Sequence, residues 1–437
     1  MKHRIAALFR QQRFATAFAV IYLFLAGPAR ALDLQTAIAE AQARDPWLTG
    51  SEWRQRSLEA RGVAAAALPD PVLRVGAANL PTDTFAFDQE PMTQFQLGLS
   101  QAIPRGATRE LERERLLALG EVESARRDER RARVALTVAE LWLDCYRSSR
   151  TQAMIEADRD LFIQLREIVA SRYRSALGVA RQQDLVRAEL ELTRLDDRLK
   201  RLAEQEAVAR THLGEWVGEA AATLEATLPK QAVDDALPAN RSARPDEAMA
   251  RLLSAHPAIR SLDQRIAAME TSVSLARERY KPGFTVNAAY GYRDDSPGGL
   301  PRADFFSIGV AVDLPLFPDQ RQDQQLRAAQ ADVEALRTER QLLLRDLRTG
   351  LETARARLRR LDERQALYQG RLLREMAQQA EAARAAYGSD DGDFAEAVRA
   401  RIDELNARIE ALDIDVERQR VIARLDYYLA GLEGDPS

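Results

Sequence analysis

The chain has 437 residues, of which 30% are charged and only 6% aromatic, and its formal net charge is −4. This composition is typical of long helices and coiled coils, and it argues against a single thick globular core. Basic residues are interleaved with acidic ones throughout, so the charge pattern indicates no nucleic-acid partner.

Residues 1–31 differ in character from the rest. Basic residues precede an apolar run from Phe14 to Gly27, which ends at Ala29-Arg30-Ala31. A basic start, a short apolar core and a small-x-small site are typical of a secretory signal peptide. The run is shorter than the roughly 20 residues that a membrane-spanning helix needs. We therefore predict a signal peptide over 1–31, with a retained membrane anchor as the alternative.

The remaining chain repeats itself at an offset of 211 residues. The matching anchors are Asp45-Pro46 with His256-Pro257, Pro71 with Pro282, Gly98 with Gly309, and Pro104 with Pro315. Such a repeat predicts a duplicated unit: helix, strand, hairpin loop, strand, very long helix, break, helix. The predicted organisation is a first repeat over 32–228, a connector over 229–245, a second repeat over 246–432 and a tail over 433–437. The opening helices are expected at about 34–67 and 246–280.

Two strand-like segments are expected in each repeat, at about 71–81 and 93–104, then at about 282–293 and 305–316. Large apolar residues alternate there with small or polar ones, as in Phe95-Gln96-Leu97-Gly98-Leu99. Strict alternation predicts one apolar and one wet face. Segments of about ten such residues match tilted transmembrane β-strands. A soluble four-stranded sheet packed on helices is the alternative.

Very long helices follow the strands. No proline occurs between Pro104 and Pro229, or between Pro318 and Pro436. The breaks lie near Gly178 and at Tyr387–Gly392, so the helix before each break should have about 70 residues and a length of about 105 Å. Such lengths are typical of coiled coils and α-helical tubes.

The sequence carries no pattern that indicates catalysis or a cofactor. After the signal segment only His212 and His256 remain, and neither belongs to a motif with a nucleophile or a second histidine. No phosphate-binding glycine loop is present. Soft metal ligands at a suitable spacing are lacking, and the single cysteine, Cys145, is expected to be a small buried side chain. We therefore predict no enzyme activity, no cofactor and no resident metal site.

Four amphipathic strands cannot close a barrel in a membrane. Within hydrocarbon every backbone N–H and C=O must be paired, and the smallest closed barrels need about eight strands. Three copies would supply twelve strands around a water-filled lumen, which predicts a homotrimer whose apolar face meets lipid. The candidate lumen residues are Arg74, Gln96, Asn287 and Arg293.

These features resemble the TolC family of outer-membrane efflux proteins over nearly all of residues 32–432. The resemblance rests on the duplicated order of elements and on the proline after the second strand of each repeat. It also rests on Gly178…Asp184-Leu185, which is similar to the family's helix-tip turn G-x5-D-L/V. The second tip, Gly388…Asp393-Phe394, is one residue shorter. The resemblance implies a twelve-stranded trimeric β-barrel, continued by an α-helical barrel into the periplasm of a Gram-negative bacterium. Its implied partners are a periplasmic adaptor (a membrane fusion protein) and an inner-membrane pump.

A finer resemblance is to the outer-membrane component of cobalt–zinc–cadmium efflux systems. It is carried by the segments Leu68–Pro71, Ala78–Pro81, Asp88–Thr93 and Leu99–Pro104. This branch implies a pump of the resistance–nodulation–division kind that exports heavy-metal cations.

The resemblance also assigns roles to the two helix tips. In the family the second tip bends inward at the periplasmic entrance, and threefold symmetry would form carboxylate rings that favour cations. The candidates for these rings are Asp390, Asp391, Asp393 and Glu396, with Arg399 or Arg401 as compensating cations. The alternative is that Asp393 only caps a helix. The candidate adaptor-docking residues are Gly178, Val179, Ala180, Arg181, Asp184, Gly388 and Ser389.

The sequence thus predicts the exit duct of a tripartite efflux pump for heavy-metal cations. Within the same family, multidrug efflux or type I protein secretion is the alternative cargo assignment. Outside it, the alternative is a soluble periplasmic coiled-coil adaptor or scaffold.

Overall fold

A computed structural model describes residues 33–174, 181–222, 224, 226–229, 245–389 and 392–431, and it is mainly helical with one small antiparallel sheet. The predicted signal peptide, most of the connector and the tail lie outside the described residues. The first half of the chain contains α2 (Leu34–Arg44), α3 (Pro46–Ala66), β1 (Val72–Ala78), β2 (Gln94–Ile103), α4 (Thr108–Arg174), α5 (Gln182–Val217) and η1 (Gly218–Ala221). The second half contains α6 (Pro245–Ser254), α7 (Pro257–Glu278), β3 (Gly283–Tyr292), β4 (Phe305–Asp313), η2 (Pro318–Gln320), α8 (Gln322–Leu367), η3 (Tyr368–Leu372), α9 (Leu373–Gly388) and α10 (Phe394–Leu429).

The chain folds into two compact units. Of the described residues, those within 45–136, 232–359 and 421–437 form the sheet unit, and those within 1–44, 137–231 and 360–420 form the helical unit. The sheet unit holds all four strands with α3, α7 and the parts of α4 and α8 next to the strands. The helical unit holds α2, α5, α9 and the remaining lengths of α4 and α8.

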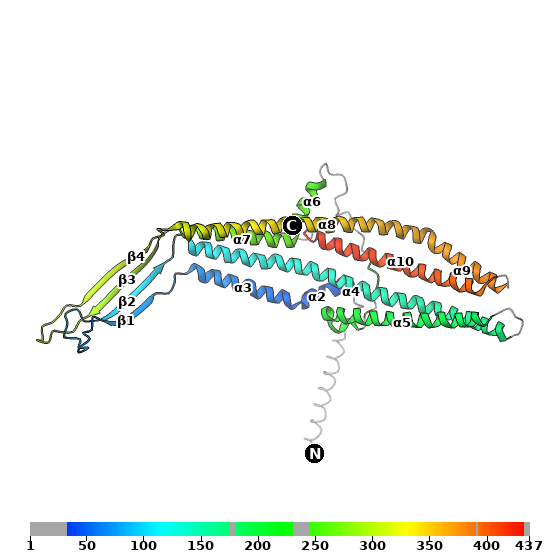
Figure 1. Ribbon diagram of the computed structural model, residues 1–437, viewed down its shortest axis with the longest axis horizontal. Coiled ribbons are helices and arrows are strands. Elements are labelled where there is room, and N and C mark those ends of the chain that lie inside the picture. Colours follow the sequence, from blue (N-terminus) through cyan, green and yellow to red (C-terminus); the bar gives the residue numbers. More distant parts are fainter. Residues whose placement is uncertain are drawn as a thin grey trace, which may run out of the picture. The chain divides into compact units, whose positions relative to one another are not determined.

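The sheet unit is built as a row of strands continued by a row of helices. The strand order is β1-β2-β3-β4, all antiparallel, and each strand lies within the range expected from its alternation. The helices follow in the same order, α3, α4, α7 and α8 (Figure 1). Side chains link each adjacent pair of helices, namely Ser51 with Glu123, Arg260 with Asp128, and Arg340 with Asp263. The edges of the sheet therefore continue into the edge helices α3 and α8.

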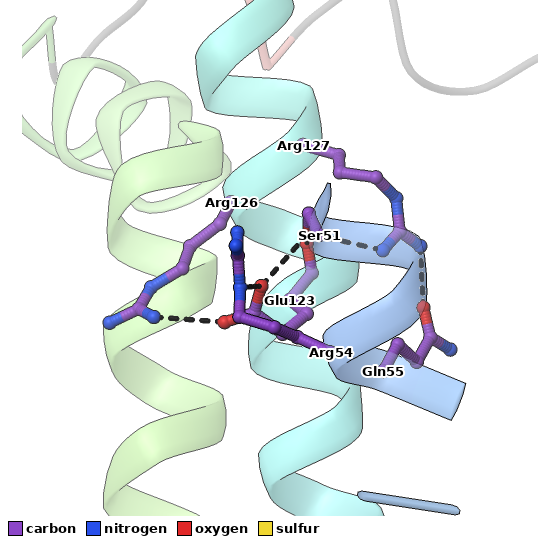
Figure 2. Close-up of polar contacts among 6 residues, drawn as sticks. All are labelled: Ser51, Arg54, Gln55, Glu123, Arg126 and Arg127. Carbon is purple, nitrogen blue, oxygen red and sulfur yellow. Dashed lines mark hydrogen bonds and ion pairs between the residues drawn. The ribbon is translucent and has the colours of Figure 1, made fainter. Parts of the chain in front are cut away.

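A buried glutamate locks α3 onto α4. Glu123 accepts hydrogen bonds from Ser51 Oγ at 2.9 Å, from Arg54 Nε at 2.9 Å and from Arg126 Nη1 at 3.0 Å (Figure 2). Burial alone would raise the pKa of Glu123, but these hydrogen bonds outweigh it and hold that pKa below its ordinary value. Arg127 donates to Gln55 on the same side of α3. The face of α3 that meets α4 is thus fixed by a complete polar network.

The expected single helix over 34–67 is wrong, and so is the one over 246–280, because each breaks about a third of the way along, at Asp45 and at His256. Asp45 has extended backbone and accepts from Trp47 N at 3.0 Å, so it caps α3, whose first residue is Pro46. His256 caps α7 in the same way, accepting from Ala258 N at 3.2 Å ahead of Pro257. A residue before proline avoids the helical region, and proline suits the first helical position. The repeat anchors Asp45-Pro46 and His256-Pro257 are therefore helix starts.

The core of the helical unit follows a seven-residue spacing. Ile155, Phe162 and Val169 of α4 pack against Ala188, Leu195 and Leu202 of α5, and against buried residues of α9 and α10. A repeat of seven keeps one seam of each helix facing its partner, as in coiled coils. The 67 residues of α4 are one uninterrupted helix. Its counterpart in the second repeat is divided by the π-helical turn η3, which the sequence pattern did not predict.

The buried cap His256 predicts a specific acid sensitivity. Its Nδ1 accepts from Ala258 N, and its Nε2 lies 3.1 Å from Tyr427 O, so the neutral Nε2–H form satisfies both contacts. Burial lowers the pKa of His256, with Glu129 and Arg133 as the nearby charged groups. Because the unfolded chain binds a proton first, His256 should reduce stability as pH falls below about 6.5.

We expect His256→Asn, which keeps a good cap, to lose about 1 kcal/mol at pH 7.5 because the hydrogen bond from the His256 ring to the Tyr427 carbonyl is lost, leaving that carbonyl only its contact with Ala430 N. It should also lose less stability than the parent between pH 7.5 and 5.5. Thermal unfolding followed by circular dichroism measures both effects. A parent and a variant with the same pH dependence would show that His256 does not titrate differently on folding.

Candidate functional site

The register of the sheet separates two faces. Odd-numbered residues of β1 and β2 pair with one another and with even-numbered residues of β3 and β4. One face therefore carries Leu73, Val75, Phe95, Leu97, Leu99, Tyr290, Phe306, Ile308 and Val310. These side chains are exposed in the single chain, and Phe306 and Ile308 are 72% and 74% exposed. An apolar face of this extent needs an apolar environment or a partner to cover it.

The opposite face is small and polar. Arg74 pairs with Gly98, Gln96 with Gly291, and Asn287 with both Ser100 and Gly309. Three of the four candidate lumen residues, Arg74, Gln96 and Asn287, therefore lie on one face of the sheet. Their role as lumen residues stays a prediction.

Arg293, the fourth candidate, lies one residue beyond the end of β3 and binds the loops. Its Nη1 donates to Pro91 O at 3.0 Å and its Nε to Ala303 O at 2.7 Å. Arg302 makes the same kind of link, donating to the carbonyls of Asp88 and Glu90. The two hairpin loops are thus tied together by arginines, a role for Arg293 that the sequence analysis missed.

Both edges of the sheet lack a further strand. Among the described residues β1 pairs only with β2, and β4 pairs only with β3. Every residue of β4 is exposed. A free edge presents unpaired backbone N–H and C=O groups that can bind another strand.

The α9–α10 tip includes the predicted acidic residues. Asp390 and Asp391 lie outside the described residues. Asp393 caps α10, since its Oδ1 accepts from Ala395 N at 3.2 Å and its carbonyl accepts from Glu396 N and Ala397 N. Both Asp393 and Glu396 are exposed. The structure therefore confirms that Asp393 caps α10, and the carboxylate ring stays a prediction.

In the single chain Arg401, one of the two candidate compensating cations, binds acidic residues away from the tip. Arg401 donates to Asp158 at 2.8 Å and to Glu404 at 2.6 Å, and Arg408 also binds Asp158. Asp158 on α4 is 2% exposed, so this is a largely buried ion-pair cluster between α4 and α10. The spacing of Arg401, Glu404 and Arg408 places all three on one face of α10. This spacing was the sequence signal that could have indicated an ion-pair cluster there. Arg399, the other candidate, is exposed.

The adaptor-docking candidates divide into surface and structural residues. Gly178, Val179 and Ala180 lie outside the described residues. Arg181 is exposed, whereas Asp184 is buried and accepts from the Arg181 backbone N–H at 3.0 Å, which anchors the start of α5. At the other tip, Ser389 Oγ donates to the Ala385 and Ala386 carbonyls, which end α9.

Gly388 contributes a carbonyl that holds the tip. Arg172 of α4 donates to Tyr387 O at 3.1 Å and to Gly388 O at 3.4 Å, and its guanidinium lies 4.7 Å from the centre of the Tyr387 ring. A cation at the end of a helix complements the helix dipole. Sequence reasoning missed Arg172, because its partners lie more than 200 positions away in the chain.

Within the described ranges, no three His, Cys, Asp or Glu side chains gather so that they could hold a metal ion. No helix of the described part is both long enough and apolar enough to cross a bilayer. His212 is exposed, and its Nδ1 lies 3.9 Å from Glu215 Oε1.

Comparisons with known proteins establish the fold. No protein-family model matches the chain, and no curated protein matches it. Among solved structures, the outer membrane protein VceC of Vibrio cholerae is 17% identical with a TM-score of 0.73, over 91% of this chain and 96% of that chain. The CmeC outer membrane channel of Campylobacter jejuni is 13% identical with a TM-score of 0.74, over 91% and 85%. The MtrE outer membrane channel of Neisseria gonorrhoeae, in its open state, is 16% identical with a TM-score of 0.70, over 91% and 88%.

The chain has the fold of these outer-membrane channels. The likeness covers both repeats, the sheet and the long helices, because 91% of the chain is matched in each case.

The cluster around Asp158 predicts a stability effect. Asp158→Asn removes the buried carboxylate that Arg401 and Arg408 both bind and leaves them only Glu404, which should cost about 3 kcal/mol. The control is Asp196→Asn, which breaks the 3.0 Å pair with Arg159, where both side chains are at least 40% exposed, and should cost less than about 1 kcal/mol. Thermal unfolding of both variants compares them. Equal losses would contradict the assignment of Asp158 as a core ion pair.

Proposed function

We propose that this chain is an outer-membrane channel that serves as the exit duct of a tripartite efflux pump, as a member of the TolC family. The observation that carries the proposal is the sheet, with one exposed apolar face, one polar face and two free edges. The likeness to solved outer-membrane channels over 91% of the chain supports it. The role is non-enzymatic, in keeping with the channel proteins that share the fold.

Three copies assemble in this proposal. Twelve strands close a barrel in which the Phe306 face meets lipid and the Asn287 face meets water. The long helices continue into the periplasm, where the tips at Arg181 and Ser389 meet a periplasmic adaptor and, through it, an inner-membrane pump. The alternative outside this family, a soluble periplasmic adaptor or scaffold, would leave the apolar face of the sheet in water.

The proposed cargo is heavy-metal cations, exported by a pump of the resistance–nodulation–division kind. The four branch-like segments of the sequence and the exposed carboxylates Asp393 and Glu396 support this assignment. The channel passes the cation, and selection belongs to the pump. Multidrug efflux and protein secretion remain the competing cargoes.

The channel is tested by reconstitution. Purified mature protein in a planar bilayer should give discrete conductance steps, and membrane fractionation should recover it with the outer membrane. A protein that stays in the soluble periplasmic fraction and gives no conductance contradicts the proposal and supports the scaffold.

For the cargo, a deletion strain should become sensitive to cobalt, zinc and cadmium salts. Sensitivity to hydrophobic drugs alone would transfer the assignment to multidrug efflux.

The carboxylate ring is tested by variants that keep the helix cap. Asp393→Asn retains a good N-cap while removing the charge, and Glu396→Gln removes the second charge. If the carboxylates line the entrance, the double variant should show lower cation-over-anion permeability in single-channel recordings. Asp197→Asn, at an exposed acid on α5, is the matched control and should change nothing. Unchanged selectivity in the double variant would leave Asp393 with a capping role alone.

A further inference from the structure

A basic cavity of about 510 Å³ lies where the sheet meets its helices, between α4, α7 and α8. Arg105, Arg279 and Arg321 line it. Glu112 is the one acidic side chain among its described lining residues, and it already binds Arg115, three residues further along α4. The wall of the cavity therefore carries an excess of positive charge.

Two of these three arginines keep their guanidinium groups available. Arg105 is engaged, because its Nη1 donates to the Arg279 carbonyl at 3.1 Å and its Nη2 lies 3.5 Å from Asp313 Oδ2. Within the described part of the chain, the guanidinium groups of Arg279 and Arg321 make no hydrogen bond and no ion pair. Like charges held close together repel one another, and an anion bound between them would reverse that cost.

Two long helices begin at the same cavity. Thr108 is the first residue of α4 and Gln322 is the first residue of α8, and both line the wall. The start of a helix carries a partial positive charge and backbone N–H groups without partners inside the helix. Anions bind at such helix starts. Both helices therefore add to the positive potential of the arginines.

Buried glutamine side chains in the wall lack a hydrogen-bond donor. Gln322 is only 7% exposed, and its Oε1, like that of Gln325, accepts no hydrogen bond among the described residues. A buried acceptor without a donor costs free energy, so it requires an explanation. A ligand that brings an O–H group into the cavity would satisfy these oxygens. The ligand that fits the wall thus combines negative charge with a hydroxyl proton.

We propose that this cavity binds hydrogen phosphate. The anion has acceptor oxygens for the guanidinium groups and at least one O–H that can donate to the glutamine oxygens. Sulfate has a similar shape but no O–H at neutral pH, and the phosphodiester of a phospholipid has none either. The cavity should therefore select free phosphate over both. All its lining residues belong to the sheet unit of a single chain, so binding requires no second copy.

Arg105 places the site on the polar side of the sheet. Gly283 pairs with Asp313, and the register puts both on the face that carries Asn287. A Cβ atom at Gly283 would come 3.2 Å from Arg105 Nε and 3.3 Å from Asp313 Oδ2. Arg105 therefore extends over the polar face. In the channel proposed above, on which this consequence rests, phosphate would bind at the water-filled side of the duct.

Calorimetric titration of the purified protein in detergent tests the site. The probes are sodium phosphate and sodium sulfate at neutral pH and equal ionic strength. Phosphate should bind about tenfold more tightly than sulfate, because only phosphate can donate to the glutamine oxygens. The double variant Arg279→Gln with Arg321→Gln should weaken phosphate binding by about tenfold or more. The control, Arg327→Gln, removes an exposed arginine about 120° around α8 from Arg321 and should leave the affinity unchanged.

A second variant tests the role of the buried amide. Gln322→Met keeps the approximate volume of the side chain and removes its hydrogen-bonding atoms. It should lower the affinity for phosphate more than the affinity for sulfate, so that the preference between the two anions narrows. Thermal unfolding followed by circular dichroism shows whether each variant is folded.

The outcomes separate the phosphate site from the channel. Absence of phosphate binding, equal binding of phosphate and sulfate, or a folded double arginine variant that binds like the parent overturns the site. Displacement of phosphate by phosphatidylglycerol in mixed micelles would assign the cavity to a lipid headgroup and also overturns it. A protein that conducts ions but binds no phosphate loses the site and keeps the channel. One that binds phosphate but gives no conductance loses the channel alone.

Discussion

The free edges of the four-stranded sheet are the constraint on which the rest of the structure depends. Each inner strand satisfies its backbone groups through its neighbours, but within the described part of the chain the outer sides of β1 and β4 have no partner strand. In water such edges can be solvated, whereas in hydrocarbon every unpaired N–H or C=O costs several kcal/mol. The apolar face that carries Ile308 is exposed in the single chain, and contact of that face with water is unfavourable. A closed ring of strands satisfies both requirements at once.

The helices extend that constraint away from the sheet. Because the order α3, α4, α7, α8 repeats the strand order, an open row of strands necessarily continues as an open row of helices. The Glu123 network fixes α3 against α4. In the helical unit, heptad packing and the Asp158 cluster hold α4 against α10. These contacts hold the helices of each unit together.

Local patterns could be predicted from the sequence, and long-range partners could not. Alternation in Phe95–Leu99 is a period of two, which any reader of the sequence can see, and the strands lie where it predicts. The breaks at Asp45 and His256 were missed, although Pro46 and Pro257 were noticed, because helical periodicity continues on both sides. The partner of Arg401 was missed because Asp158 lies 243 positions away, and no local pattern connects them. Asp393 was anticipated as a cap because capping is a local rule.

The central claim is that the sheet closes only by joining copies of the chain. It is tested most directly by measuring how many chains the purified mature protein contains, using sedimentation with correction for bound detergent. The account predicts three chains in a complex that requires detergent to remain in solution. A single chain that is monodisperse in buffer without detergent would contradict it.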